Sequence, residues 1–374
     1  MNMSNVIARV ATEPAQPTAH PVRQEDTDHR AGPHAPAAIG PADAIGQIPE
    51  IDVAGDAAQG RYRQHCNTTP YIPLFSQAWW LDATAGPGNW SAALVERGGQ
   101  VVASLPYAPR RMFGFSVIAQ PALAKMAGPW LAPMDGKPPR VLGQQKELMD
   151  ELIAQLPPFD HFQQHWDASQ TNWLPFAWKG FRQTTKYTYV LDDLSDTDAI
   201  WNGMQPNIRA EIRKAGSRHG LQVRDDLGIE AFIKLNRQVF TRQGMRLPYT
   251  DDYVRRLDAA CAARGARKIF IAEDKLGRRH AGVYLVWDGR VAYYLMGGSD
   301  PVLRTSGASS LCMWEAIRHA SGVARTFDFE GSMLEPVERF FRAFGARQQP
   351  YFFIQKTPSR ILLTYLFLRS LRNP

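Results

Sequence analysis

The sequence has no apolar run long enough to cross a bilayer. A spanning helix needs about 20 mostly apolar residues, and no part of the 374-residue sequence approaches that. An apolar segment of the kind found in secretory signal peptides is also missing after the first residues. These two absences predict a cytoplasmic protein without an integral membrane segment.

Cysteine is scarce, and the sequence offers no obvious metal ligands. Cys66, Cys261 and Cys312 are far apart and form no Cys-x-x-Cys pair, which argues against a disulfide framework or a thiolate metal site. Cys312 lies in a run of small and apolar residues, so we expect it to pack in a core. His161 and His165 have His-x-x-x-His spacing, but no Glu adjoins His161 and the run is typical of a strand. We therefore expect no metal.

Residues 1–50 contain no Phe, Trp or Tyr, and they contain seven prolines. Such a segment cannot bury enough apolar surface to offset the entropy lost on ordering. The composition therefore predicts disorder over residues 1–60, before the first globular part.

The charge balance is basic, with a formal net charge of +7 and a pI near 9.3. A basic protein favours anionic partners. The candidates are nucleic acid, a phosphorylated carrier lipid, a nucleotide cofactor and an acidic bilayer.

The stretch from residue 268 to residue 345 carries the clearest pattern. Three β-rich segments separated by turn residues predict strands at 269–273, 281–287 and 290–296. A glycine-bearing loop then leads into a predicted helix at 307–321, a short strand at 326–330 and a second helix that ends near residue 345. A loop that feeds a helix N-terminus beside a sheet can direct backbone N–H groups at an anion.

The rest of the chain also predicts an α/β fold. A hairpin is expected at 92–96 and 101–106, a helix at 144–156 and a strand at 159–166. Asn207 is a predicted N-cap, and the remaining expected elements are a strand at 186–191, helices at 207–219, 229–243 and 251–264, and a last strand at 351–355. The hairpin segment WSAALVERGGQVVASLPY resembles the later KIFIAEDKLGRRHAGVYLVW, which suggests two versions of one unit.

Two motif runs resemble the Fem-type proteins, relatives of the GNAT N-acyltransferases. They are AYYLMGGSDPVLRTSGASSLCMWEAI with FDFEGSMLEPVERFFRAFG in the second half, and PLFSQAWWLDATAGPGNWSAALVERGGQVVASLPYAPRR in the first. Together the matches cover about residues 70–356. The resemblance implies two GNAT-like domains, at 61–185 and 186–357, each with a mixed central sheet flanked by helices.

The resemblance also implies a donor-binding loop. GNAT enzymes commonly place Arg/Gln-x-x-Gly-x-Gly/Ala before a helix whose backbone amides hold the pyrophosphate of coenzyme A. In this sequence Arg304, Ser306, Gly307 and Ala308 occupy that position, but Ser309 stands where Gly or Ala is usual. The alternative is that Gly307 has no ligand and serves only to turn the chain into the following helix.

Three further residues are candidates for the chemistry. Strand alternation places Asp328 and Glu330 on one face, where a carboxylate can take the proton of an attacking amine; the alternative is that they cap helices or pair with arginines. Tyr293 and Tyr294 point to opposite faces, so one of them, Tyr294 in our assignment, can offer its hydroxyl to the cleft.

Four residues are candidates for substrate binding. Arg209 and Arg213 are one helical turn apart and can form a phosphate clamp, although an ordinary solvated face explains them as well. Gln243 follows a predicted helix and can lie near the substrate. Ser332 follows the carboxylate motif, and its spacing to Glu335 also resembles a capping box.

The segment 358–374 is a basic, Leu/Phe-rich tail with the sequence RILLTYLFLRSLR at its centre. Its composition is typical of an interfacial membrane anchor, and the alternative is a helix docked on the domain. An anchor would suit work on lipid-linked precursors at the inner leaflet of the cytoplasmic membrane.

The function that these features imply is N-acyl transfer to an amino group of a cell-envelope or polysaccharide precursor. The acceptor would be a small molecule or a lipid-linked glycan, and the donor acyl-coenzyme A. A second interpretation takes aminoacyl-tRNA as the donor, as in peptidoglycan-bridge transferases. A third, of another class, is a catalytically silent module that binds nucleic acid or envelope glycan. The oligomeric state stays open.

Overall fold

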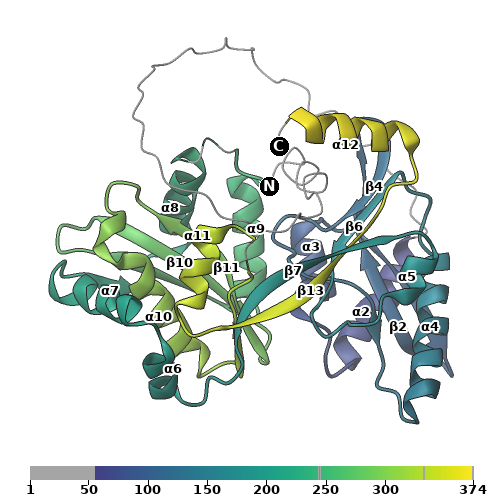
Figure 1. The fold of residues 1–374 in the computed structure, drawn as a ribbon, viewed down its shortest axis with the longest axis horizontal. Helices are drawn as coiled ribbons and strands as arrows, with labels where there is room; N and C mark the ends of the chain where they lie inside the picture. Colours follow the sequence, from purple (N-terminus) through teal and green to yellow (C-terminus); the bar gives the residue numbers. More distant parts are fainter. Residues whose placement is uncertain (1–54, 243, 245, 332, 373–374) are drawn as a thin grey trace, which may run out of the picture.

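The computed structural model describes residues 55–242, 244, 246–331 and 333–372. It has a mixed α/β fold with a ten-stranded sheet and a smaller three-stranded sheet (Figure 1). The predicted α/β class, a large mixed sheet flanked by helices, is therefore confirmed. The predicted disorder of residues 1–54 lies outside the described residues, whereas residues 55–60 begin helix α2 (Gly55–Thr68).

One large sheet runs through both halves of the chain. Its order is β3-β4-β6-β13-β7-β12-β11-β10-β9-β8. The strands are β3 (Pro109–Met112), β4 (Phe115–Ala119), β6 (His161–His165), β13 (Arg347–Lys356), β7 (Arg182–Leu191), β12 (Thr326–Asp328), β11 (Val291–Ser299), β10 (Arg279–Trp287), β9 (Arg267–Glu273) and β8 (Gln222–Arg224).

Strands β7 and β13 form the bridge between the two halves (Figure 1). They pair antiparallel from Arg182 with Gln355 to Val190 with Arg347. The end of β13 also pairs with β6, a strand of the first half. The domain boundary expected at residues 185–186 falls inside β7, so the two halves share a sheet.

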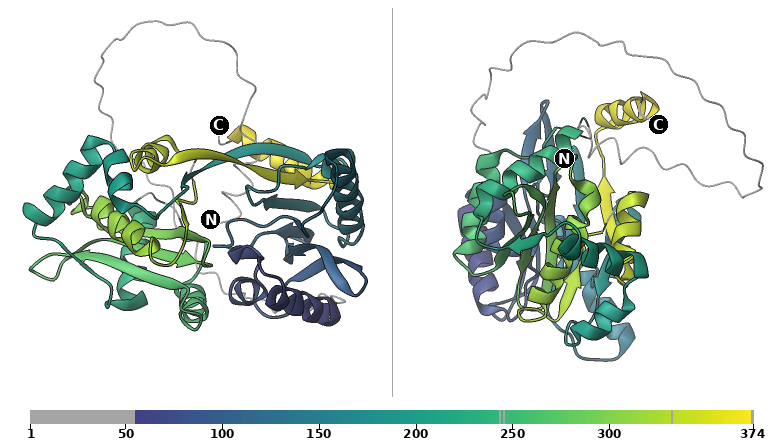
Figure 2. Two further views of the ribbon diagram at one scale, coloured as in Figure 1. Left: turned by 90° about the horizontal axis from the view of Figure 1, so that it is seen from below. Right: turned by 90° about the vertical axis from the view of Figure 1, so that its left-hand side faces the viewer.

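Helices cover both faces of the sheet in the second half (Figure 2). Both faces need this cover because apolar side chains of the strands point to each of them. One face packs against α7 (Pro206–Ser217), α10 (Ala308–Ala320) and α11 (Glu335–Arg342), beside the short α6 (Thr197–Gly203). The other packs against α8 (Gly228–Arg242) and α9 (Asp251–Ala262). In β10, Val283 and Leu285 face the first layer, and Tyr284 and Val286 face the second.

The first half has a core of its own beside the large sheet. The small sheet joins the predicted hairpin, β1 (Ser91–Arg97) and β2 (Gln100–Tyr107), to β5 (Trp130–Leu131). Its inner side chains pack with α4 (Pro138–Ala154), α5 (Leu174–Trp178) and the near face of β4, β6 and β13. Helices α2 and α3 (Ala78–Thr84) form a further cluster with β1.

A shared core joins the halves. Phe75 and Trp80, from the 3₁₀ turn Leu74–Ser76 and α3, pack in one cluster with α8, α9 and β9–β11. The ring centroids of Phe75 and Tyr293 are 4.8 Å apart. Arg256 of α9 donates to the backbone oxygen of Ala83 over 2.9 Å. The two halves are therefore one packed unit.

Several local predictions need correction. The N-cap of α7 is Gln205, because the helix already begins at Pro206, and Asn207 is inside it. The hairpin of β3 and β4 was not expected from the sequence, nor was helix α5. The predicted strands at 269–273, 281–287 and 290–296 correspond to β9, β10 and β11.

The C-terminal tail is a helix, α12 (Arg360–Arg372). It lies across the end of β4 (Figure 1), where Leu362 and Leu366 are buried and pack against Phe115. Among the described residues, no helix is long and apolar enough to cross a membrane.

The shared core predicts one cooperative unfolding transition for the described unit. Phe75→Ala removes a ring that is 1% exposed and should lower the free energy of unfolding by about 3–5 kcal/mol. Calorimetry should show a single transition that moves to lower temperature as a whole. Trp178→Ala, at a side chain that is 61% exposed, is the control and should change little. Two transitions, only one of them shifted, would contradict the shared core.

Candidate active site

The candidate site begins where two neighbouring strands part. Strands β11 and β12 are parallel partners only from Val291 with Thr326 to Tyr293 with Asp328. Strand β11 continues to Ser299, whereas β12 ends at Asp328. Beyond Tyr293, no described strand pairs with that edge of β11, so its backbone groups there are available to a ligand.

A bulge shapes β11 at the same level. Tyr284 of β10 pairs with Met296 and the next residue, Leu285, pairs with Tyr294, so Leu295 is an extra residue on β11. Bulges bend a strand and redirect its side chains, often beside active sites. The amide nitrogen Nδ2 of Asn236 donates to the backbone oxygen of Gly297 over 2.7 Å and holds the bent strand against α8.

The chain turns sharply after β12. Glu330 has φ +61° and Gly331 has φ +57°, so two successive residues lie in the left-handed region. A Cβ atom on Gly331 would overlap the backbone oxygen of Tyr187, which explains the glycine. Glu330 has no such freedom, and a non-glycine residue held in this region is strained. The strain fixes where the Glu330 carboxyl points.

Asp328 is buried, and two donors bind one of its carboxyl oxygens. The Thr188 hydroxyl donates to its Oδ1, and the Glu330 backbone N–H donates to the same oxygen over 2.7 Å. The neighbouring Phe327 and Phe329 face the opposite core, with ring centroids 4.8 Å apart. The structure therefore places Asp328 and Glu330 away from the two phenylalanines, as strand alternation predicts.

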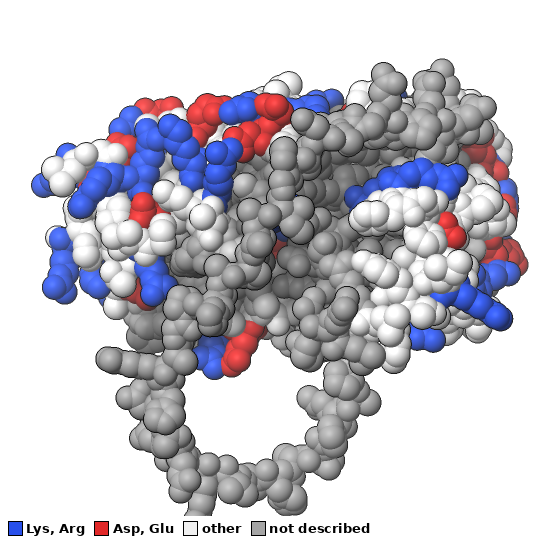
Figure 3. Space-filling view, turned by 90° about the horizontal axis from the view of Figure 1, so that it is seen from above, with Lys and Arg blue, Asp and Glu red and all other residues white. Residues whose placement is uncertain are grey.

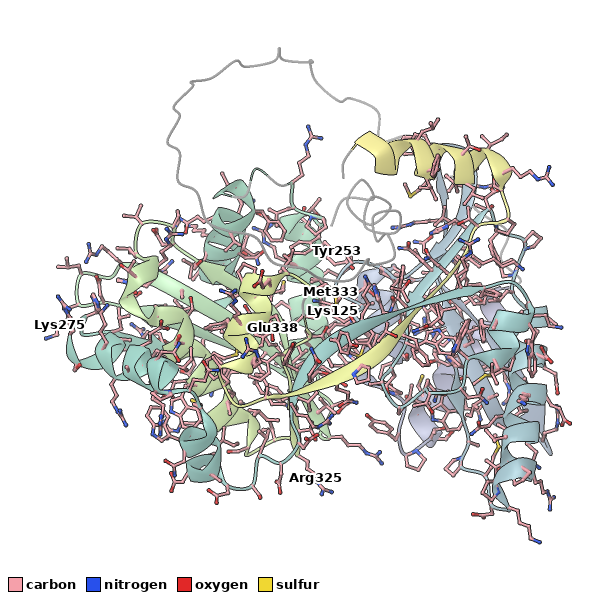
Figure 4. The ribbon with its side chains drawn as sticks, in the orientation of Figure 1. Lys125, Tyr253, Lys275, Arg325, Met333 and Glu338 are labelled. Carbon is pink, nitrogen blue, oxygen red and sulfur yellow. The ribbon has the colours of Figure 1, made fainter. Side chains whose placement is uncertain are left out.

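Glu330 meets a cation from the other half of the chain. Its Oε2 is 3.7 Å from Nζ of Lys125, which lies in the loop between β4 and β5 (Figure 4). The Glu330 side chain is 4% exposed and that of Lys125 is 34% exposed. Oε1 of Glu330 has no hydrogen-bond partner among the described residues. One buried carboxyl oxygen is thus free to meet a substrate.

The Lys125 loop is itself held from the second half. The Tyr253 hydroxyl, on α9, donates to the backbone oxygen of Ala122 (Figure 4). Leu123 is in the left-handed region, with φ +61°. The sequence carries no signal for Lys125, because its contact with Glu330 joins segments that are far apart in the chain.

The pKa of each carboxyl group is raised above its ordinary value. Burial raises the pKa of Asp328 to about 6, against the lowering effect of its two hydrogen-bond donors. Burial also raises the pKa of Glu330, with Lys125 opposing the shift and Asp328 adding to it. Two interacting acids of this kind titrate as a pair. Near neutral pH the pair can hold or accept a proton, the property that a general base for an amine requires.

Tyr294 is the third predicted catalytic residue. Its ring meets Phe341 of α11 edge-on, with centroids 5.8 Å apart. A Cβ atom on Gly297 would overlap the Tyr294 hydroxyl oxygen, so this hydroxyl lies over the bent part of β11. It has no hydrogen-bond partner among the described residues. Burial raises the pKa of Tyr294 to about 12, which keeps it a neutral donor.

The predicted donor loop lies at the start of α10. Gly307 is the N-cap, with φ +77°, and no side chain caps this helix. A Cβ atom on Gly307 would lie 2.5 Å from the backbone oxygen of Glu211, so the glycine allows α10 to pack on α7. Arg304 is exposed beside this helix start, and Ala308 is buried in its first turn. Uncapped amides and an exposed guanidinium fit a phosphate group.

Ser306 is used inside the loop. Its hydroxyl is buried, lies 2.9 Å from Nδ1 of His280 and donates to the backbone oxygen of Leu303. Nε2 of His280 is 3.2 Å from Oδ2 of Asp274, in the turn between β9 and β10. Ser306, His280 and Asp274 form a hydrogen-bonded set that holds this turn to the donor loop. The Ser306 hydroxyl therefore points into the loop.

Of the predicted substrate residues, Arg209 and Arg213 lie away from the carboxyl pair. Arg209 and Arg213 lie on α7, on the face of the sheet opposite the pair. Arg213 stacks on Trp201, with its guanidinium carbon 5.4 Å from the ring centroid. Gln243 and Ser332 lie outside the described residues.

The described part of the chain contains no cluster of three His, Cys, Asp or Glu residues that could hold a metal. His161 bonds Thr357 and Gln163, as part of the sheet surface. Cys312 is fully buried, and burial raises the pKa of its thiol to about 12, which suits a packing role.

Comparison with known proteins defines the second half. Residues 203–342, which span α7 to α11 and both carboxyl groups, match the family model described as acetyltransferase (GNAT) domain. This segment is therefore similar to GNAT acetyltransferase domains. No curated protein matches the chain at a significant level.

Solved structures extend the fold likeness to the whole described chain. The crystal structure of FemX has a TM-score of 0.61 and 13% sequence identity, covering 82% of this chain and 98% of that one. The C-terminal domain of a protein assigned as lysylphosphatidylglycerol synthetase, from Agrobacterium fabrum, has a TM-score of 0.50 and 12% identity, covering 84% and 97%. The Fem-like fold expected from the sequence is therefore confirmed.

The raised pKa values predict how stability depends on pH. Folding raises both pKa values above those of the unfolded chain, near 4, so the folded state binds more protons in the interval between. The stability of the wild type should therefore fall as pH rises from about 4 through the folded pKa values, by up to about 1.4 kcal/mol per pH unit per carboxyl. Urea unfolding at several pH values measures this slope.

The double variant Asp328→Asn and Glu330→Gln is the comparison, since amides keep the shape and lose the titration. Its unfolding free energy should fall less steeply between pH 5 and about 8. Parallel curves for the two proteins would show that the carboxyl groups titrate normally in the folded state.

Proposed function

We propose that this GNAT domain catalyses N-acyl transfer to an amino group of a cell-envelope or polysaccharide precursor. One observation carries the proposal: a buried carboxyl pair with raised pKa values stands where β11 and β12 part. The donor is acyl-coenzyme A, and aminoacyl-tRNA is the second candidate. Both carry phosphate and an activated carbonyl group.

The carboxyl pair supplies the base. An amine attacks only with its lone pair free, so an ammonium group must first lose a proton. Oε1 of Glu330 has no hydrogen-bond partner among the described residues and accepts that proton. Asp328 is held beside Glu330 by the Thr188 hydroxyl and the Glu330 amide. Its negative charge raises the pKa of Glu330 and so makes Glu330 a stronger base. The positive charge of Lys125 lowers the pKa of Glu330, so that Glu330 can also release the proton.

The unpaired edge of β11 and Tyr294 serve the acyl group. The amine nitrogen forms a bond to the carbonyl carbon, and negative charge develops on the carbonyl oxygen. Backbone N–H groups on the edge of β11 stabilise that charge. The bond to the leaving sulfur, or to the leaving ribose oxygen, then breaks. The Tyr294 hydroxyl, neutral at physiological pH, gives a proton to that atom, and the second proton lost by the attacking nitrogen returns to the tyrosinate through water.

The two substrates approach from opposite faces of the sheet. The start of α10 and Arg304 lie on the α7–α10 side, and the carboxyl pair lies on the α8–α9 side. The two faces of the sheet meet at the point where β11 and β12 stop pairing. A donor held by its phosphates at α10 would reach the amine through this parting.

The similar structures support an envelope acceptor. One is FemX, and the name of the other refers to a lysyl-bearing phospholipid. We propose a small-molecule or lipid-linked acceptor and a place in the cytoplasm, at the inner face of the membrane. Mass spectrometry of envelope precursors from a deletion strain would identify the acceptor.

The carboxyl pair predicts a strong loss of turnover in the variants Asp328→Asn and Glu330→Gln. Each should lower turnover about a hundredfold, measured as release of the free thiol or of uncharged tRNA with the identified acceptor. Glu335→Gln, at an exposed acid on α11, is the control and should leave turnover unchanged. Lys125→Met removes the cation that lowers the pKa of Glu330, so the rising limb of the pH–rate profile should move to higher pH. Variants that fold and keep wild-type turnover would remove these residues from the site.

The start of α10 predicts how donor affinity responds to charge. Ser309→Asp adds an anion to the first turn, which favours the helix and repels phosphate. Affinity for the donor should fall about tenfold or more while the melting temperature stays the same or rises. The neutral variant Ser309→Asn is the matched control, and Arg304→Gln should also weaken binding. Gly307→Val is unsuitable, because its side chain would collide with α7.

Calorimetric titration with acyl-coenzyme A, and separately with charged tRNA, measures the affinity. If neither donor binds to the wild type, the acyl-transfer proposal fails and the silent binding module becomes the better interpretation.

A further inference from the structure

The strongest unexplained surface feature is apolar and lies at the C-terminal helix. We call it the apical patch and define it by five side chains: Phe113, Ile361, Leu363, Tyr365 and Leu368. Their exposed fractions are 89%, 75%, 50%, 49% and 56%. Such a group of large exposed apolar side chains on one region marks an interaction site more often than chance exposure does.

The patch combines two elements that are packed together. Leu362 and Leu366 of α12 are buried against Phe115, the first residue of β4. Phe113 is at the tip of the same β3–β4 hairpin. On the helix, Ile361, Tyr365 and Leu368 recur at intervals of four and three residues and so form one stripe. The helix and the hairpin tip are therefore held on the same side of the molecule.

The hairpin tip has an unusual residue for its backbone. Met112 pairs with Phe115, which leaves Phe113 and Gly114 as a two-residue turn. Both have positive φ, +49° and +83°. Turns of this geometry favour Asn-Gly or Asp-Gly, because a bulky residue in the left-handed region is strained. Phe113 is therefore unfavourable twice: its apolar ring is exposed to water, and its backbone has a conformation that Phe rarely adopts. Residues held in such strained conformations cluster at functional sites.

The two segments that carry the patch contain basic residues and no acidic ones. Residues 109–119 contain two arginines, residues 358–374 contain three, and neither segment contains Asp or Glu. Arg111 and Arg360 are exposed. Asp160, beside β4, accepts a hydrogen bond from the Ser116 amide. In Figure 3, which looks onto the side carrying α12, the uncharged surface on the right has Lys and Arg above and below it and some Asp or Glu at its right edge. This arrangement complements an anionic surface.

We propose that the apical patch adsorbs to an anionic bilayer. Phe113 and the stripe on α12 enter the headgroup region, and Arg111 and Arg360 meet the lipid phosphates. A protruding hairpin tip beside a helix suits a soft, flat layer better than a groove-shaped partner. The proposal assigns the hairpin a role beyond the tail, and it does not depend on the acyl-transfer chemistry.

The test is flotation of the full chain with vesicles at low and high salt. One set of vesicles contains phosphatidylcholine alone, and the other contains phosphatidylcholine with phosphatidylglycerol. The wild type should float with the anionic vesicles at low salt, and this binding should weaken at high salt. The double variant Ile361→Ser and Leu368→Ser should reduce the partition coefficient about tenfold or more.

Phe113→Asn is the decisive variant. It gives the turn its preferred Asn-Gly sequence, so the melting temperature should stay the same or rise while the membrane-bound fraction falls. Leu276→Ser is the matched control: Leu276 is 77% exposed next to Lys275, at the far end of the molecule (Figure 4), and the variant should float like the wild type.

Three results would overturn the proposal. The first is a wild type that fails to float, and the second is equal flotation with neutral and anionic vesicles. The third is that the patch joins two copies of the chain instead. Sedimentation would then show a dimer for the wild type and a monomer for the double variant Ile361→Ser and Leu368→Ser. Donor titration of the same proteins is independent: patch variants should bind donor normally, so failure of one proposal leaves the other measurable.

Discussion

The antiparallel pairing of β7 and β13 is the interaction on which the candidate site depends. It carries one hydrogen-bonded sheet from the first half of the chain into the second. With the shared core around Phe75 and Trp80, it keeps the Lys125 loop at a fixed place beside Glu330. A site assembled from both halves can be accurate only if the halves do not move independently, and this sheet removes that freedom.

The carboxyl pair is a compromise between burial and charge. Taking a carboxylate out of water is costly unless it is paired or hydrogen-bonded. Asp328 is satisfied by two donors, whereas Glu330 has one partly exposed lysine at 3.7 Å and a free oxygen. The effect of burial on the pKa is larger than that of these partners. The pair therefore keeps a proton at a pH where exposed carboxyl groups are ionised. Together with the left-handed backbone at Glu330, this is stored energy at one point of the fold.

Much of the fold could be predicted from local patterns. The strands and helices between residues 267 and 342 follow from alternation and helical periodicity, because both faces of this sheet are buried. The same alternation correctly separated Asp328 from Phe327. The β3–β4 hairpin was missed because its turn is Phe-Gly, which breaks the usual rule. Asn207 was mistaken for a cap because Pro206 already begins the helix.

The rest of the site could not be read from the sequence, because it depends on contacts between distant segments. Nothing around Lys125 distinguishes it from a surface lysine until the loop is placed beside Glu330. Ser306 looked like a donor contact by its position in the loop. Only its distance to His280 shows that the hydroxyl faces inward.

The position of β13 in the sheet has a consequence for synthesis. Its residues, 347–356, are translated after β6 and β7, yet the strand lies between these two in the sheet. Until it arrives, β6 and β7 each lack a neighbour and present unpaired strand edges, which are sites of aggregation. Closing the sheet also requires contacts between segments that are far apart in the chain, and such contacts form slowly. The first half is thus translated well before it can be completed, and the nascent chain has an interval in which chaperones would matter most.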